Sequence, residues 1–417
     1  MDAPVSQRKI TTEKFSIIRQ QSEKLCAPLE IEDFVAQPVV DVSPPRWHLA
    51  HTTWFFETFI LVPRMKGYKL FHPSYPYLFN SYYVQAGERW QRAERGYLTR
   101  PTVKEILAYR NYVNEHVLEF LENTEINHEL AYLMELGFQH EQQHQELLLY
   151  DIKYILGHNP LFPEYARLVK SNIVRTEGSW RRIESGNYQI GYSGDDFHFD
   201  NEKGIHTVFL HDFEIADRLV TKGEYLGFLE ARGYEKTELW LDEGWKWVAE
   251  NEIKSPMYWV RDDGGWMEYT LNGLQPIDKN DPLVHVSFYE ADAYARWKGV
   301  RLPTEHEWEV ACKLLNPKPN PDSNFVESEL YGTRQENTLN FFGNVWEWTA
   351  SAYRPYPFYE APEGVLGEYN GKFMINQMVL RGGSFATPAN HIRSTYRNFF
   401  HPHLRWLFSG IRLARHI

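Results

Sequence analysis

Two histidines that stand four residues apart, His140 and His144, are the first feature of the sequence that could do chemistry. They fall in a run expected to be helical over about residues 127–155, and residues four apart on an α-helix face the same way. Their face also carries mostly apolar or small side chains and therefore points inward: Leu133, Gly137, Leu147 and Asp151. Two neutral imidazoles on an inward face are a common way to bind a metal ion, so the pair predicts a metal site rather than two core histidines.

A third ligand is expected upstream, in the aromatic-rich segment 47–57, where His48 and His51 stand three residues apart. Metal sites in helical bundles are built from side chains on facing helices. One of these histidines together with the downstream pair would make a three-histidine face, which leaves coordination positions open for substrates and dioxygen. The spacing alone does not choose between His48 and His51.

The downstream pair also matches HExxH, the signature of zinc metalloproteases, and this is the main rival interpretation. Glu141 would then activate a zinc-bound water. Glu164 could supply a further carboxylate ligand, but the prolines just before it disfavour a rigid helical position. The extended pattern with a third downstream histidine is absent from the sequence after His144.

Four helices are expected to position these histidines. Besides the run over 127–155, helix-start signals and apolar periodicity predict helices at about 12–25, at about 45–61 and, after Thr102, at 103–124. The apolar stripe of the 103–124 helix is Val103, Ile106, Leu107, Val113, Val117 and Leu121. Four helices, with a long aromatic-rich connection over about 67–100, predict a bundle.

The character of the sequence changes after Pro163. Short alternating segments at 188–192 and 206–216 predict strands, and two short helices are expected at about 221–233 and 287–299. The chain is therefore expected to hold a helical domain over 1–163, a linker over 164–178 and an α+β domain over 179–417.

The amino-acid composition limits the classes of molecule that the protein is expected to bind. The net charge of −12 offers no basic excess to neutralise phosphates, so nucleic acid and anionic membranes are not expected partners. Aromatic residues make up 16% of the 417 residues, which favours a small-molecule pocket. The sequence has no signal-peptide pattern and no membrane-length apolar run, and its two cysteines, Cys26 and Cys312, suit a reducing compartment, so we expect a cytoplasmic protein. The oligomeric state is left open.

Nearly the whole chain resembles the ergothioneine sulfoxide synthases, the EgtB family. The W-x-L-A-H element of that family is here residues 47–51, which selects His51, and its HxxQH element is here His140 to His144. The downstream hallmarks lie in order at 220–228, 282–309, 343–349, 380–385, 393–402 and 408–415. The resemblance implies an α+β two-domain fold, with a DinB-like four-helix bundle followed by a formylglycine-generating-enzyme-like domain of C-type-lectin-like architecture.

The resemblance also implies a reaction. His51, His140 and His144 would hold a non-haem Fe(II). An oxidoreductase of this family uses dioxygen to join the imidazole of N-alpha-trimethylhistidine (hercynine) to the sulfur of a cysteine-type substrate, and it leaves a sulfoxide.

Departures from the better-known branch of the family concern the sulfur donor. The run that is Asn-Trp-Asp in that branch is here Asn398, Phe399 and Phe400, and Leu404 stands in place of one arginine. Losing charged groups that would pair with a glutamyl head leaves a less polar site. Free cysteine is therefore expected in place of gamma-glutamylcysteine.

The catalytic tyrosine usual in the C-terminal domain is also replaced. The best match puts Leu366 at that place and keeps Tyr369 nearby. The resemblance to the cysteine-using branch instead implies that Tyr82 or Tyr83 supplies the phenol beside the iron, and it does not choose between them.

Substrate-binding residues follow from the same resemblance. Arg92 and Arg95 match an arginine pair near the thiol substrate, where a guanidinium suits a carboxylate. The remaining expected substrate contacts, to hercynine or to the thiol, are Gln143, Tyr369, Asn398, Phe399 and Phe400. Phe399 and Tyr369 would face the trimethylammonium group by cation–π attraction.

Three further alternatives stay open beside the protease. An ovothiol-type synthase would join cysteine to histidine, but that family usually carries a methyltransferase domain, for which no glycine-rich nucleotide loop is found here. An enzyme of the formylglycine-generating type would need a reactive cysteine pair in the second domain, where only Cys312 lies. A binding module without catalysis is disfavoured, because three inward histidines are costly to bury without a metal.

Overall fold

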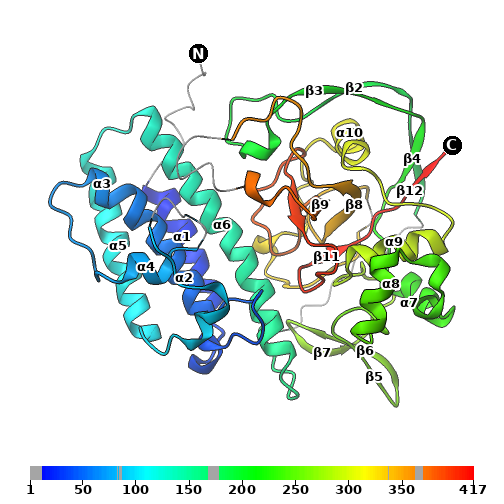
Figure 1. Cartoon of the computed structure of the whole chain (residues 1–417), viewed down its shortest axis with the longest axis horizontal. Coiled ribbons are helices and arrows are strands. Elements are labelled where there is room, and N and C mark those ends of the chain that lie inside the picture. The colour runs from blue at the N-terminus through cyan, green and yellow to red at the C-terminus, as the bar shows by residue number, and fades with distance from the viewer. Residues whose placement is uncertain (1–11, 82, 84–86, 168–177, 337, 362–369) are drawn as a thin grey trace. The chain divides into compact units, whose positions relative to one another are not determined.

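The computed structural model describes residues 12–81, 83, 87–167, 178–336, 338–361 and 370–417. The chain divides into two compact units, which are described here one at a time. The first comprises Met1–Pro160 with the short segments Gly194–Phe197 and Ala361–Tyr369, and the second comprises the rest. The first unit is helical and the second mixes helices with small sheets (Figure 1), so the expected α+β two-domain fold is confirmed. The residue limits predicted for the domains and the linker stay predictions.

Long helices build the first unit. Among the described residues they are α1 (Thr12–Cys26), α2 (Pro45–Phe56), α5 (Val103–Asn123) and α6 (His128–Gly157). The helix α2 packs against both α5 and α6, and α1 also packs against α6. Short elements fill the connections: 3-10 helices at Ile31–Val35 and Arg92–Tyr97, a π-helical turn at Glu57–Leu61, α3 (Val62–Arg64) and α4 (Tyr75–Phe79). The expected helical bundle is therefore the architecture of this unit.

The starts of α5 and α6 follow from their sequences. The Thr102 hydroxyl accepts a hydrogen bond from the Glu105 backbone N–H, and the Glu105 carboxylate accepts one from the Thr102 N–H, so α5 begins with a capping box. Asn127 caps α6 through the Leu130 N–H. The predicted apolar stripe of α5 is buried except at Leu107, whose side chain is 38% exposed. The inclusion of Leu107 in the stripe is wrong, because the buried face of α5 is narrower than the predicted apolar stripe.

Burial on α2 decides what the histidines can do. Every residue of α2 is buried, and most of α6 is buried as well. Pro45 at the first helical position favours the start of α2 there. A backbone N–H at that position has no partner within the helix, so proline loses no hydrogen bond by lacking one. A helix buried on all faces brings its polar side chains into the core, where each needs a specific partner.

Small sheets and short helices make up the second unit. Its sheets have the strand orders β1-β4-β12, β10-β9-β8-β11, β2-β3 and β5-β6-β7. The strands are β1 (Trp180–Ile183), β2 (Gly186–Ile190), β3 (His206–Leu210), β4 (Phe213–Ala216), β5 (Trp259–Asp262), β6 (Gly265–Thr270), β7 (Gly273–Pro276), β8 (Trp346–Ala352), β9 (Met378–Arg381), β10 (Asn398–Phe400), β11 (Ser409–Gly410) and β12 (Ala414–His416). The segment predicted as strand over 206–216 is two strands, because Asp212 turns the chain between them and accepts a hydrogen bond from the Ser185 N–H.

The second unit has more helix than the sequence predicted. The two expected helices are α7 (Lys222–Glu230) and α9 (Phe288–Trp297), and the described residues add α8 (Asp242–Glu250) and α10 (Glu305–Leu315). Gly244 in α8 lowers helix propensity, but the Tyr289 ring lies 3.0 Å from where its Cβ would stand, so close packing explains the glycine. A capping box between Thr304 and Glu307 starts α10.

Several hallmark motifs of the second unit build its core. Glu347, in the 343–349 motif, accepts two hydrogen bonds from Arg412 and one from the Trp308 indole N–H, each at 2.6–2.7 Å. Glu305 in the same way pairs with Arg381 and Arg397. All of these side chains are buried, so the motifs supply a paired ionic scaffold for the domain.

Candidate metal centre

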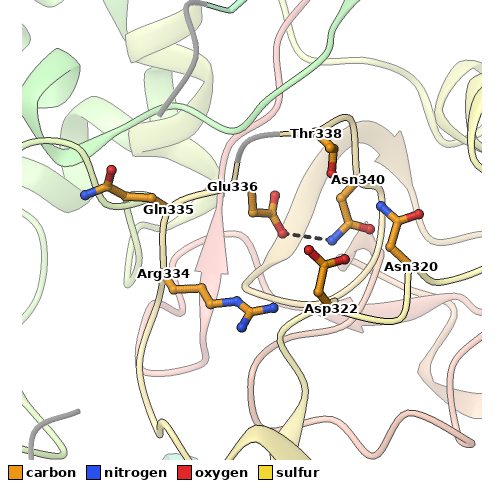
Figure 2. A pocket seen from close by; sticks show the side chains of 7 residues that line it. All are labelled: Asn320, Asp322, Arg334, Gln335, Glu336, Thr338 and Asn340. Carbon is orange, nitrogen blue, oxygen red and sulfur yellow. Dashed lines mark hydrogen bonds between the residues drawn. The ribbon is translucent and has the colours of Figure 1, made fainter. Parts of the chain in front are cut away.

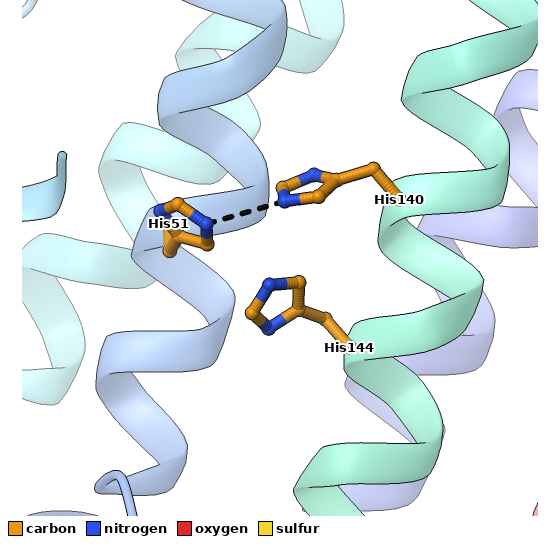
Figure 3. A group of neighbouring side chains, drawn as sticks. All are labelled: His51, His140 and His144. Carbon is orange, nitrogen blue, oxygen red and sulfur yellow. Dashed lines mark hydrogen bonds between the residues drawn. The ribbon is translucent and has the colours of Figure 1, made fainter. Parts of the chain in front are cut away.

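Three histidines from two helices meet inside the first unit (Figure 3). His51 comes from α2, His140 and His144 come from α6, and one ring nitrogen from each lies within 4.8 Å of the others. The Nε2 atoms of His51 and His140 are 3.2 Å apart. No other group of three or more metal-ligating side chains is found among the described residues. The structure therefore places His51, and not His48, in one three-histidine group with the downstream pair.

The three imidazoles are held neutral by their surroundings. Burial lowers the pKa of His140 to about 3. Burial, followed by the neighbouring imidazole of His140, lowers the pKa of His51 and His144 well below the usual value. A metal ion binds the neutral form of histidine, so this cluster does not have to lose protons before it takes one.

Hydrogen bonds on the outer side of the cluster orient the rings. The His51 Nδ1 lies 2.6 Å from the Phe79 carbonyl oxygen, which can only accept, so His51 carries its proton on Nδ1 and presents the Nε2 lone pair inward. The His144 Nδ1 lies 2.9 Å from Nδ1 of His48. Its Nε2 is therefore the nitrogen left for the centre.

Aromatic rings wall the cluster. Trp47 and Trp54 both stack on His51, with ring centroids 4.5 and 5.4 Å away and interplanar angles of 12° and 13°. Phe55 lies against His140 at 4.9 Å. Rings of this kind fix the imidazole planes and exclude water, which strengthens electrostatic interactions inside the site.

The donor set fits a divalent transition metal. Three neutral nitrogens from rigid helices suit iron or zinc. One ring nitrogen of each histidine lies within 4.8 Å of the others, which suits three atoms that share one ion.

Glu141 does not face this centre. Its carboxylate accepts hydrogen bonds from Arg110 and Ser22 at 2.6 Å and from Arg19 at 2.8 Å. Although burial alone would raise the pKa of Glu141, Arg110 and Arg19 lower it to about 2. A carboxylate held in this way is the partner of two buried arginines and is not available as the base that a metalloprotease needs.

Comparisons with known proteins find matches for both units. Residues 14–148 match the DinB superfamily, and residues 165–317 and 317–417 match the sulfatase-modifying factor enzyme 1-like domain. A Hercynine oxygenase of Mycobacterium tuberculosis is 29% identical over 68% of this chain and 71% of its own length. Those of Mycolicibacterium thermoresistibile and Mycolicibacterium smegmatis are each 28% identical over 89% of this chain, and over 87% and 91% of their own lengths.

The chain belongs to the EgtB family. The expectation of an oxygen-dependent oxidoreductase is confirmed at the level of enzyme class. Among the described residues, no helix combines the length and the apolar character needed to cross a bilayer.

The arginine pair expected in this EgtB-family chain is split between two environments. Arg95 is buried, donates hydrogen bonds to the Ser43 and Ser81 hydroxyls at 2.8 Å, and lies 3.3 Å above the Trp47 ring that stacks on His51. The Arg92 side chain is 39% exposed and donates to the Asp41 carbonyl at 2.6 Å. Arg95 alone of the two is coupled to the histidine cluster.

Of the two expected tyrosines, Tyr82 lies outside the described residues. Tyr83 is buried, and its ring lies 5.6 Å from Trp54 and 5.5 Å from Phe59. Because Trp54 stacks on His51, Tyr83 belongs to the ring cluster around the centre. Gln143 is half-buried on α6, between the two histidines of that helix.

The remaining predicted substrate residues belong to the second unit. Asn398, Phe399 and Phe400 form β10, and Phe399 stacks on Tyr353 with centroids 4.1 Å apart. Phe400 meets Trp406 edge to face at 5.2 Å. Tyr369 lies outside the described residues. The roles of these residues toward substrate stay predictions.

The second unit also has a polar pocket (Figure 2). It is lined by Asn320, Asp322, Arg334, Gln335, Glu336, Thr338 and Asn340. Asn340 donates a hydrogen bond to Glu336, and burial raises the pKa of Glu336 to about 7. Its lining has none of the aromatic or thiol-binding residues expected for the reaction.

Cysteine chemistry is not supported in the second unit. Cys312 is buried in α10, and burial raises the pKa of its thiol well above the usual value. A thiol of this kind is inert, so the formylglycine-generating alternative lacks its nucleophile among the described residues.

Two sets of residues around the centre were not assigned from the sequence. Asp151 was noted only as part of the inward face of α6, and it lies 2.9 Å from His48. Arg19 and Arg110, which hold Glu141, carried no local signal because they come from α1 and α5. In the sequence, only the three-residue spacing of His48 and His51 indicated that the histidine that is not a ligand could lie beside the site.

Proposed function

We propose that this chain is a non-haem Fe(II)-dependent sulfoxide synthase that uses dioxygen to join hercynine to cysteine, giving hercynylcysteine sulfoxide. The observation that carries the proposal is the meeting of three buried, neutral imidazoles, His51, His140 and His144, at one point. Membership of the EgtB family supports the pathway, and the hercynine oxygenases to which the chain is similar support the substrate.

The proposed reaction balances with one molecule of dioxygen. The imidazole carbon between the two nitrogens loses its hydrogen, the thiol loses its hydrogen, and a carbon–sulfur bond forms. One oxygen atom goes to sulfur, and the other leaves as water with the two hydrogens. The four electrons taken from the substrates reduce dioxygen completely, so no further reductant is needed.

Fe(II), held by His51, His140 and His144, would supply one-electron chemistry with dioxygen and positions for the thiolate and the hercynine imidazole. The protein orients these imidazoles and keeps water away from them with the rings of Trp47, Trp54 and Phe55. A neutral ligand set leaves the thiolate as the anion that balances the metal charge.

The other residues of the first unit have roles that follow from their positions. Tyr83, in the ring cluster on Trp54, is the proposed phenol that donates a proton or hydrogen bond to reduced oxygen. Arg95, buried next to Trp47, is the proposed partner of the cysteine carboxylate, and Gln143 of the hercynine ring. From the second unit, Asn398 and Phe399 are proposed to bind the carboxylate and the trimethylammonium group of hercynine.

Cysteine is the proposed sulfur donor because Phe400 and Leu404 replace charged residues of the better-known branch. The Phe400 ring lies against Trp406, so two aromatic rings meet at this position. A gamma-glutamyl head would lose its water here without gaining a charged partner.

A competition experiment tests the proposal. The Fe(II)-loaded protein is incubated in air with hercynine and equal amounts of cysteine and gamma-glutamylcysteine, and the sulfoxides are measured by mass. We expect hercynylcysteine sulfoxide to dominate. A dominant dipeptide product would contradict the assignment of Phe400 and Leu404, and product from histidine but not from hercynine would favour the ovothiol-type reaction.

A further inference from the structure

A chain of hydrogen bonds leads from His144 to a buried carboxylate. The His144 Nδ1 lies 2.9 Å from Nδ1 of His48, and the His48 Nε2 lies 2.9 Å from Oδ2 of Asp151. All three side chains are buried, with 8%, 3% and 2% exposure. Since α2 contributes the middle residue and α6 the other two, the chain crosses between these helices.

The ligand role of His144 fixes the direction of each bond. A histidine that binds a metal through Nε2 carries its proton on Nδ1, so the His144 Nδ1–H donates to the His48 Nδ1. Because the His48 Nδ1 accepts this bond, the proton of His48 lies on Nε2 and is donated to Oδ2 of Asp151.

The other helix of the site uses a different acceptor. His51 donates its Nδ1–H to the Phe79 backbone carbonyl, which is neutral. His144 donates to an imidazole that itself donates to a carboxylate, so its acceptor is polarised by a negative charge. Of these two ligands, His144 is the one whose donor strength is coupled to an anion.

The carboxylate at the end of the chain is held in place. Oδ2 of Asp151 also accepts a hydrogen bond from the Ser43 backbone N–H at 2.8 Å. The Ser43 hydroxyl in turn accepts from Arg95, whose guanidinium lies over Trp47. The Asp151 carboxylate is therefore held by Ser43, which precedes α2, and Ser43 is in turn held by Arg95.

We infer that His48 and Asp151 are positioning residues that set the tautomer of His144 and strengthen it as a ligand for the metal. The inference rests on the proposed function, because it assigns these two residues to the same metal centre. Groups that hydrogen-bond a metal-ligating histidine typically contribute tenfold to hundredfold to metal affinity.

Two substitutions separate the charge from the hydrogen bonds. Asp151→Asn keeps an oxygen that can accept from His48 and Ser43 but removes the negative charge. His48→Phe keeps an aromatic ring in the space but removes both bonds. Tyr109→Phe is the matched control, since it removes a hydrogen bond to a buried carboxylate, that of Glu57, elsewhere in the same bundle.

The measurement is Co(II) affinity of the full chain, by competition with a chelator, with circular dichroism as the check on folding. We expect Asp151→Asn and His48→Phe each to bind Co(II) at least tenfold more weakly than Tyr109→Phe, which should stay close to the wild type. A loss smaller than tenfold relative to Tyr109→Phe would overturn the inference.

A second measurement needs no variant. Nitrogen-15 NMR of the metal-free wild-type chain should find His144 with its proton on Nδ1, and the tautomer with the proton on Nε2 would overturn the inference. If the wild type binds no Co(II) at all, the proposed metal function fails. The tautomer of His144 then tests by itself whether the hydrogen bonds run from His144 through His48 to Asp151.

Discussion

At the scale of single residues, the chemistry depends on ring orientation. His51 differs from the two histidines of α6 because two indoles stack on it and a backbone carbonyl holds its outer nitrogen. These contacts place one lone pair toward the other two imidazoles. Each ligand of such a centre contributes through both its nitrogen and the groups that aim it.

His51→Ala should remove metal binding without unfolding the bundle. The variant keeps two ligands on α6 but loses the one from α2, and we expect Co(II) affinity to fall by more than about 100-fold, beyond the loss typical of a residue that only hydrogen-bonds a ligand. Titration with a competing chelator checks this. Wild-type affinity in the variant would show that the metal binds elsewhere.

Tyr83→Phe should slow the reaction and leave the fold intact. Loss of a proton donor at the reacting oxygen typically costs about 10²–10⁴-fold in kcat. The control is Tyr75→Phe, a buried tyrosine of α4 whose ring stacks on His72. Product formation measured by mass checks both variants, and an unchanged kcat in Tyr83→Phe would make Tyr83 a packing residue only.

At the scale of helices, the sequence predicted which segments form helices better than it predicted which of their faces meet. The four bundle helices follow from caps such as Thr102 and Asn127 and from apolar periodicity, and the α6 pair follows from its four-residue spacing. The choice between His48 and His51 did not follow from residue types, since α2 is buried on every face and its pattern does not say which side meets α6. The family motif made that choice.

Glu141 is a second case in which the local sequence did not predict which way a side chain faces. Its place in an HExxH string indicated a catalytic base, whereas the structure pairs it with Arg19 from α1 and Arg110 from α5. Those partners are 122 and 31 residues away in the sequence. Local pattern cannot predict ion pairs of that separation.

Glu141→Gln should therefore destabilise the bundle rather than abolish catalysis. Leaving two buried arginines without their carboxylate should cost about 3 kcal/mol of unfolding free energy at pH 7. The pKa of Glu141 is lowered from 4.5 to about 2, so its contribution is fully present above pH 4.5 and is lost as the pH falls toward 2. Turnover of the folded fraction should stay near that of the wild type.

Urea unfolding of wild type and Glu141→Gln at several pH values checks this. The difference in unfolding free energy should shrink as the pH falls from 4.5 toward 2. A difference that stays constant over this range would mean that the carboxylate charge is not what stabilises the bundle, and loss of turnover in folded protein would return Glu141 to a catalytic role.

At the scale of the whole molecule, the two units contribute in different ways. The first carries the histidine cluster, and the fold class of both was predictable from the change of pattern after Pro163. In the second, α8 and α10 were not counted, although both are amphipathic helices; the glycine within α8 and the proline before α10 are residues that also mark turns. The motifs there turned out to pair buried charges, as Arg412 does with Glu347, which sequence resemblance alone does not separate from substrate binding.

The most direct test of the account couples oxygen to product. The Fe(II)-loaded wild type is given hercynine and cysteine in a sealed oxygen electrode, and the sulfoxide is quantified by mass, beside His51→Ala. The account predicts one dioxygen consumed for each hercynylcysteine sulfoxide formed by the wild type, and neither uptake nor product above background in the variant. Equal product from His51→Ala, or a wild type that binds only zinc and never consumes oxygen, would contradict it.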